Sequence, residues 1–249
     1  MSFIEVKNFK KSFGDKVVHK DVTFTVEKGE CMGLLGGSGA GKSVILRALI
    51  GLEKPDSGSI KIDGAETFGL KERQWIPIRK RVAYAFQGGA LFDSMTVMEN
   101  ISYPLQEHTN LNEKEIEEKV LKTLEDLGLS GTEDLLPASL SGGMQKRVGL
   151  ARAIVLDPEV ILYDEPTAGL DPFNTIRIQE TIMQLKERGV TSILVTHDMP
   201  SAFAVCDKMA VLEAGKIAAS GKISDLDTKK GGVIYRFVHG EIKQNGYKK

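Results

Sequence analysis

The sequence predicts an α/β fold built on a mostly parallel sheet, and three observations support this. Continuous apolar runs at Cys31–Leu35, Val160–Tyr163 and Ser192–Thr196 are typical of strands buried on both faces of a parallel sheet. Segments of helical periodicity lie between these runs, as strand–helix–strand units require. A glycine-rich segment follows the first run and leads into residues 44–52, which are apolar almost all round and therefore predict a buried helix.

The length and composition are those of a soluble globular chain with a sizeable core. The chain has 249 residues, of which 41% are hydrophobic and 27% charged, and its formal net charge is −1. No apolar run approaches the roughly 20 residues of a membrane-spanning helix, and the N-terminus has neither the basic nor the apolar part of a signal peptide. Cys31 and Cys206 have no CxxC spacing and are expected to be reduced core residues of a cytosolic protein. These features exclude a secreted disulfide scaffold, a membrane-spanning protein and a disordered tail protein. The charge balance argues against a large nucleic-acid footprint and leaves a local basic patch open, and no nucleic-acid partner is expected.

The N-terminal segment predicts an antiparallel β subdomain. Residues 3–6 and 22–26 alternate between apolar and polar side chains, and Val17–Val18 adds a short apolar pair between them. The turn dipeptide Gly14-Asp15 separates the first run from the others. Alternation of this kind suits a sheet with one face exposed to water.

Residues 88–156 predict a mostly helical insertion in the core. Asn112 and Glu115 have the spacing of a capping box at the start of a helix, and Gly128 ends that helix. A second helix is expected from Ser141 to about Leu156.

The chain returns to the core after this insertion. A helix is expected at about 174–187, and Lys208–Leu212 and Lys216–Ala219 predict a hairpin. The predicted organisation is one domain at 1–240, with a core at 1–87 and 157–222, a helical subdomain at 88–156, and a C-terminal tail at 223–249.

Residues 36–43 match the phosphate-binding pattern GxxxxGK[ST] between a buried strand and a helix. Small residues are needed there because backbone N–H groups must wrap the phosphates without side chains in the way. Lys42 is expected to reach the β- and γ-phosphates of a nucleotide, and the Ser43 hydroxyl to bind Mg²⁺. The residues predicted to hold the nucleotide in this segment are Gly36, Gly37, Ser38, Gly39, Ala40, Gly41, Lys42 and Ser43.

The buried strand Val160–Tyr163 ends in two acids, Asp164 and Glu165. Asp164 is expected to hold Mg²⁺ through water, as the acidic partner of the phosphate loop does in P-loop enzymes. Glu165 would then orient or deprotonate the attacking water. The alternative interpretation is a pair of capping residues before a helix.

A second anion cradle is predicted at Ser141, Gly142 and Gly143, which stand at a helix start after Leu140. One nucleotide does not need two cradles on one chain. The economical interpretation is that this cradle closes on ATP held by a second copy.

At this point the chain resembles the ATP-binding-cassette (ABC) ATPases over essentially its whole length. That family has a P-loop NTPase (RecA-like) core, an antiparallel β subdomain and a helical subdomain that carries the LSGG signature. The matching features, in chain order, are Phe13, the loop 36–43, Gln87, LSGG at 140–143, Asp164-Glu165, Ala168-Gly169-Leu170-Asp171 and His197.

The resemblance implies roles for four further residues. Phe13 would stack on adenine, and Gln87 would sense Mg²⁺ and the attacking water and link them to a membrane partner. Asp171 would lie across the interface of an ATPase homodimer, and His197 would contact the γ-phosphate. By themselves, Phe13 is more typical of a core residue, His197 of a structural histidine, and Gln87 is uninformative.

Two positions depart from the family pattern. Val44 stands where many members carry a second hydroxyl residue near the α-phosphate, although it is kept among the predicted nucleotide-binding residues. Met144 stands where many members carry glutamine after the signature.

Within the family, three segments resemble the ATPases of Mla phospholipid transporters and of related systems with Mce proteins. They are Phe86–Phe92, Tyr103-Pro104-Leu105 and Glu107-His108-Thr109. In the alternative interpretation, in which these residues have only a structural role, Pro104 stops a short helix. The C-terminal segment 233–240 also resembles that subgroup, where it would dock on the neighbouring ATPase; packing on its own domain is the alternative.

The resemblance implies an ATP-hydrolysing subunit that powers lipid transport from the cytoplasmic face of the inner membrane. Two copies would enclose two Mg-ATP and move an integral membrane permease (MlaE-like) held near Gln87 and residues 88–105. Its further implied partners are an Mce-domain protein and a STAS-domain regulator.

Three alternatives differ in class. One is the ATPase of a small-solute importer. Another is a soluble ABC ATPase acting on DNA or ribosomes, although the chain has one cassette and no heptad run. A P-loop small-molecule kinase fits least, because it has no use for the second cradle.

Overall fold

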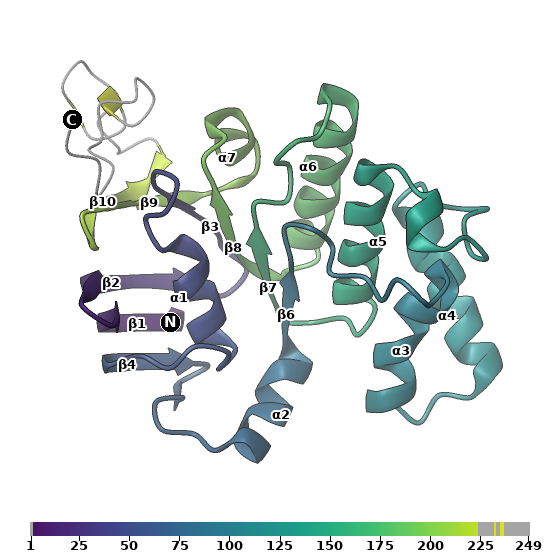
Figure 1. Ribbon diagram of the computed structural model, residues 1–249, viewed down its shortest axis with the longest axis horizontal. Helices are drawn as coiled ribbons and strands as arrows, with labels where there is room; N and C mark the ends of the chain where they lie inside the picture. The colour runs from purple at the N-terminus through teal and green to yellow at the C-terminus, as the bar shows by residue number, and fades with distance from the viewer. Residues whose placement is uncertain (1, 224–231, 233–234, 237–249) are drawn as a thin grey trace.

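A single ten-stranded sheet runs through the part of the chain that the computed structural model describes, residues 2–223, 232, 235 and 236 (Figure 1). The strand order is β5-β4-β1-β2-β10-β9-β3-β8-β7-β6. The strands are β1 (Ser2–Phe13), β2 (Lys16–Glu27), β3 (Cys31–Leu35), β4 (Ser57–Ile62), β5 (Ala65–Glu66), β6 (Val82–Ala85), β7 (Val160–Asp164), β8 (Thr191–Thr196), β9 (Lys208–Glu213) and β10 (Lys216–Lys222).

The antiparallel part of the sheet consists of β1, β2, β4 and β5. Its strands are longer than expected: β1 continues to Phe13, and the runs at 17–18 and 22–26 belong to one strand, β2. Register shifts break the strict alternation in β1 and β2. At these bulges the two strands stay paired, although the alternation of apolar and polar side chains is interrupted.

The parallel part of the sheet contains the predicted buried strands. β3, β8 and β7 are parallel neighbours, and all of their side chains are buried. Leu35 lies opposite Thr196, and Asp164 lies opposite Val195. The carboxyl ends of the three strands therefore meet at one edge, where ligands of open α/β sheets bind. The predicted hairpin is confirmed as the antiparallel pair of β9 and β10.

The helices cover both faces and one end of this sheet (Figure 1). Helix α1 packs over one face, and the helices α3, α4 and α5 form a group beyond β6. The helices are α1 (Lys42–Leu49), α2 (Glu72–Arg81), α3 (Val97–His108), α4 (Glu113–Asp126), α5 (Gly142–Ile154), α6 (Pro172–Glu187) and α7 (Met199–Val205), with a 3-10 turn η1 at Pro137–Ser139.

The local signals at the helix ends are confirmed. Asn112 caps α4, with the Glu115 side chain completing the capping box, and Ser141 caps α5. The interpretation of Pro104 as a helix stop is wrong, because α3 continues past it to His108.

Two hydrophobic clusters lie on opposite faces of the parallel strands. Along β7, Leu162 belongs to the cluster under α1, whereas Ile161 and Tyr163 belong to the cluster under α5 and α6. Cys31 and Cys206 are both buried free thiols, as expected.

The described residues contain no helix long and apolar enough to cross a membrane. The predicted boundaries of core and helical subdomain stay predictions. The predicted docking segment in the tail falls almost entirely outside the described residues.

Candidate functional site

The phosphate loop connects β3 to α1 and is backed by β2. Gly41 has φ +93°, and a Cβ there would lie 2.5 Å from Cγ1 of Val18. Only glycine fits both the backbone conformation and this approach. The next residue, Lys42, starts α1. The loop geometry therefore sets where the lysine and the serine after it enter the site.

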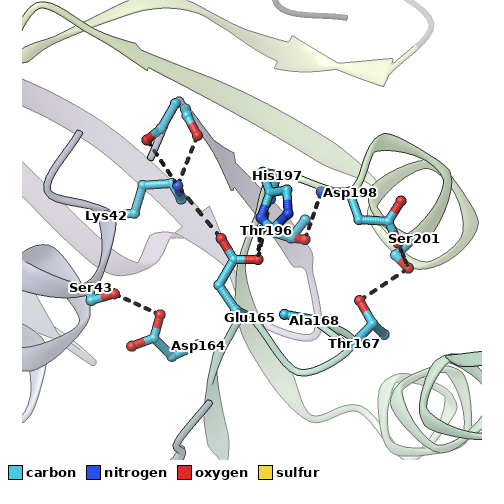
Figure 2. A network of polar contacts seen from close by, with 12 residues as sticks. Lys42, Ser43, Asp164, Glu165, Thr167, Ala168, Thr196, His197, Asp198 and Ser201 are labelled. Carbon is cyan, nitrogen blue, oxygen red and sulfur yellow. Dashed lines mark hydrogen bonds and ion pairs between the residues drawn. The ribbon is translucent and has the colours of Figure 1, made fainter. Parts of the chain in front are cut away.

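The Lys42 side chain lies across the loop (Figure 2). Its Nζ donates hydrogen bonds to the carbonyl oxygens of Gly36 at 2.8 Å and Gly37 at 3.2 Å, and lies 3.6 Å from Oε1 of Glu165. Burial lowers the pKa of Lys42, and the nearby Glu165 carboxylate opposes that shift. A phosphate in the loop would offer this ammonium a stronger partner than two carbonyl groups.

Ser43 and Asp164 meet where a metal ion would be expected. The Ser43 hydroxyl donates to Oδ1 of Asp164 at 2.7 Å (Figure 2). The Tyr84 hydroxyl donates to Oδ2 at 2.7 Å. Asp164 is 6% exposed. A hydroxyl, a carboxylate, phosphate oxygens and water are a ligand set that suits Mg²⁺. Among the described residues, no group of three His, Cys, Asp or Glu side chains is placed to hold a metal ion.

Glu165 is held in an unusual conformation directly after β7. Its φ is +52°, which is uncommon for a residue with a side chain, and its N–H donates to the Val195 carbonyl at 2.9 Å. The carboxylate lies 2.9 Å from Nδ1 of His197 (Figure 2), whose side chain is 64% exposed. Glu165 is therefore clamped between the Lys42 ammonium and an imidazole that reaches toward solvent.

An open hollow of about 650 Å³ lies beside these groups, between the phosphate loop, the end of β7 and α7. Its lining includes Gly37, Glu165, Ala168, His197 and Asp198. Its position next to Glu165 leaves room for a second surface to close over the site.

The predicted second cradle lies elsewhere on the chain. Ser141 accepts a hydrogen bond from the Met144 N–H at 3.3 Å and caps α5. Residues 140–143 are absent from the lining of the hollow, and α5 lies beyond β6 and β7 from α1 (Figure 1). A single chain does not bring its two anion cradles together.

Asp171 caps α6 and is tied to the signature helix. Its carboxylate accepts from the Asn174 N–H at 3.0 Å and from the Asn174 amide, and these hydrogen bonds lower the pKa of Asp171. Arg147 on α5 donates to the same amide side chain. Asp171 thus has a structural role, and its predicted place across a dimer interface stays a prediction.

The remaining predicted residues lie around the site without joining it. Phe13 is 46% exposed, so its interpretation as a core residue is wrong; the Lys11 ammonium lies 4.9 Å from its ring centroid. Gln87 is exposed and makes no side-chain hydrogen bond within the described residues, and Val44 is half-buried on α1.

Two residues of the site were missed by sequence reasoning. His19 is 1% exposed, and its Nε2 lies 3.1 Å from the carbonyl oxygen of Gly41, beneath the loop. Tyr84 contacts Asp164. A register shift near His19 breaks the alternation that would have indicated its inward position. Tyr84 reaches Asp164 through the pairing of β6 with β7, which the local sequence pattern does not reveal.

Comparison with known proteins gives consistent results. The sequence model described as "ABC transporter" matches residues 19–168. A probable ribonucleotide transport ATP-binding protein of Mycobacterium leprae is 43% identical over 95% of this chain, which spans 69% of that protein. The intermembrane phospholipid transport system ATP-binding protein MlaF of Haemophilus influenzae is 37% identical over 96% of this chain and 91% of that protein. A solved dimeric ATP-binding cassette bound to ADP and Pi has a TM-score of 0.83 and 30% identity, covering 88% of this chain and 98% of that one.

Proposed function

The chain belongs to the ABC transporter family, and we propose that within it this ATPase powers a phospholipid transporter of the Mla and Mce type. As a member of the family it is an ATP-hydrolysing transport ATPase. The observation that carries the lipid proposal is the similarity to a phospholipid-transport ATPase over 96% of this chain and 91% of that relative.

Each residue of the site has a proposed task in hydrolysis. Backbone N–H groups of residues 36–41 and the Lys42 ammonium would bind the phosphates. Ser43 and Asp164 would hold Mg²⁺, which neutralises charge on the β- and γ-phosphates when bound. Glu165 would accept a proton from the attacking water, and His197 would keep its carboxylate in place.

The active form proposed is a homodimer. The signature segment 140–143 of one copy would close on the nucleotide bound to residues 36–43 of the other, over the open hollow beside Glu165. The separation of the two cradles in one chain supports this arrangement, as does the dimeric state of the similar cassette bound to ADP and Pi. Closure would move a permease, and hydrolysis would reset it.

A groove between the core and the helical subdomain is the proposed permease site. It has a volume of about 380 Å³ and is lined by Phe86, Phe92 and Tyr103, with Arg152 stacked over the Phe92 ring at 5.3 Å. All three aromatic side chains are partly exposed. An exposed aromatic floor with a basic rim is the chemistry of a protein-docking surface, and Gln87 follows Phe86 directly.

The test is purification of a tagged Glu165→Gln chain from native membranes with ATP present, followed by mass spectrometry of proteins and lipids. We expect a multi-span permease, an Mce-domain protein and phospholipid. The STAS-domain regulator and attachment to the cytoplasmic face of the inner membrane are proposals that the same sample tests. Recovery of only soluble nucleic-acid or ribosomal partners would overturn the transporter proposal.

A small-solute cargo is the second candidate, because the mycobacterial relative at 43% identity is named for ribonucleotide transport. The same purification separates the two. Recovery of a solute permease with a binding protein, and of no phospholipid above the level bound by a control membrane protein, would support small-solute transport. The ATPase assignment would then stand, and the phospholipid proposal would not.

A further inference from the structure

Tyr84 brings a hydroxyl group from a neighbouring strand to the end of β7. Strands β6 and β7 are parallel neighbours, with Tyr84 opposite Leu162. From this position the Tyr84 side chain reaches the carboxylate two residues further along β7, and its hydroxyl donates to Oδ2 of Asp164 at 2.7 Å. This contact connects β6 to Asp164, the proposed metal-binding acid. It is the contribution of β6 to the phosphate site.

The Asp164 carboxylate is held at both of its oxygens. Ser43 donates to Oδ1 and Tyr84 to Oδ2, both at 2.7 Å, and the residue is buried. A carboxylate fixed at both oxygens cannot rotate about its last torsion angle, so its free lone pairs keep one direction. Hydrogen bonds to a charged acceptor are stronger than neutral ones, which makes this orientation costly to change.

Tyr84 is itself held in place. Its ring packs against the hydrophobic cluster under α1, and the Phe86 ring lies 4.3 Å away between centroids at an angle of 34°. Burial and the hydrogen bond to Asp164 raise the pKa of Tyr84 well above its ordinary value.

We propose that Tyr84 is a positioning residue for the magnesium site, which orients the Asp164 carboxylate for the metal and its water ligands. The inference rests on the proposed Mg²⁺ chemistry of Ser43 and Asp164. Because Tyr84 acts through Asp164, its removal should weaken metal binding and leave the phosphate contacts of the loop alone. A residue that only supported the fold would not separate these two effects.

The test compares Tyr84→Phe with Tyr163→Phe. Tyr163 is the residue before Asp164, but its side chain lies in the cluster on the opposite face of the sheet, so the second variant loses the same hydroxyl without touching the carboxylate. Mn²⁺ replaces Mg²⁺ as the probe, since both prefer carboxylate and phosphate oxygens. Binding of Mn²⁺ to the ADP-loaded chain is measured by the loss of the free-ion electron paramagnetic resonance signal. ADP affinity is measured separately in EDTA.

We expect Tyr84→Phe to raise the apparent Kd for Mn²⁺ roughly three- to tenfold, the size of one hydrogen bond. ADP affinity in EDTA should not change, and Tyr163→Phe should bind Mn²⁺ as the unaltered chain does. Equal Mn²⁺ affinity in Tyr84→Phe and the unaltered chain would overturn the positioning role alone. Failure of the unaltered ADP-loaded chain to bind Mn²⁺ would overturn the metal site itself, and this inference with it. Equal weakening of ADP binding in EDTA would assign Tyr84 to the fold instead.

Discussion

Glu165 combines backbone strain with tight side-chain restraint. A non-glycine residue at φ +52° costs on the order of 1–3 kcal/mol and persists only where its surroundings determine it. Here the Val195 carbonyl holds the N–H, and Lys42 and His197 hold the carboxylate. This conformation points the carboxylate into the hollow, where a water would attack.

Replacing this carboxylate tests its proposed role as general base. Glu165→Gln keeps the shape but cannot accept a proton, so we expect kcat to fall by a factor of about 10²–10⁴ while ATP still binds. Phosphate release gives the rate, and size-exclusion chromatography with ATP should show a trapped dimer. Lys42→Ala serves as the comparison, because it should lose hydrolysis by losing the phosphate contact. Ordinary turnover by Glu165→Gln would contradict the assignment.

His19 links the loop to the pH dependence of stability. Burial lowers the pKa of His19, although its hydrogen bond to the Gly41 carbonyl works in the opposite direction. Its Nδ1 is buried and has no hydrogen-bond partner among the described residues. The folded chain therefore binds this proton less well than the unfolded chain. Its contribution to stability is fully present above the unfolded pKa of about 6.5 and is lost as pH falls through the lower folded pKa.

Urea unfolding between pH 8 and pH 5 checks this sign. We expect the free energy of unfolding to decrease below pH 6.5 in the unaltered chain and to decrease less in His19→Gln, whose amide can still donate to Gly41. His108→Gln, which changes an exposed histidine, is the control and should keep the original slope. A stability that rose on acidification from the His19 contribution would contradict the assigned shift.

At the scale of elements, the segment after β6 is fixed to α5. Arg152 donates to the carbonyl oxygens of Gly89 at 3.0 Å and Ala90 at 2.7 Å. The backbones approach so closely that a Cβ on Gly149 would lie 2.5 Å from the Cα of Gly89. Asn100 closes the segment from α3 by bonding the backbone of Phe92. The packing of the segment after β6 against α5 and α3 thus determines the shape of the floor of the aromatic groove.

Gly149→Ala should disturb that floor. The added methyl group meets backbone that cannot yield as a flexible side chain would, so we expect a loss of roughly 1–3 kcal/mol in the free energy of unfolding. Recovery of the permease should fall with it. Gly88→Ala is the matched control for stability, because a Cβ there meets nothing within 4 Å among the described residues. Equal stability of the two variants would contradict the packing argument.

At the scale of the whole molecule, the proposed active site is divided between two copies of the chain. One chain carries the phosphate loop and Glu165 at the carboxyl ends of its parallel strands. Its signature stands at the start of α5, and α5 lies beyond β6 and β7 from α1 (Figure 1). In a two-fold dimer, the phosphate loop of each copy would face the signature of the other copy. The proposed dimer would therefore have two composite sites.

Mixing two inactive variants tests this division. Lys42→Ala removes the loop function and Ser141→Arg blocks the signature, so each homodimer has no intact site. A heterodimer has one, formed by the loop of the Ser141→Arg chain and the signature of the Lys42→Ala chain. We expect the equimolar mixture to recover hydrolysis to about a quarter of the unaltered rate, since half of the dimers carry one site of two. Full activity of Ser141→Arg alone would contradict sharing.

The sequence by itself determined the features that depend on short-range chemistry. The phosphate loop needs glycines at fixed spacing, and the buried strands need continuous apolar runs. Asn112 and Ser141 mark the starts of α4 and α5, because their side chains cap these helices. Each of these signals lies within a few residues of what it specifies. They were enough to identify the fold class and the candidate residues of the phosphate site.

Only the tertiary structure decided which side chains meet. The parallel register of β3, β8 and β7 brings Lys42, Glu165 and His197 together from segments more than 30 residues apart. Tyr84 lies in the site because β6 pairs with β7, and His19 lies there because of a bulge in the pairing of β1 and β2. The local periodicity of the sequence indicates neither placement. The separation of the two cradles likewise follows from where α5 packs. Long-range contacts are chosen by the packing of the whole sheet, whereas the sequence pattern records only which face each residue prefers.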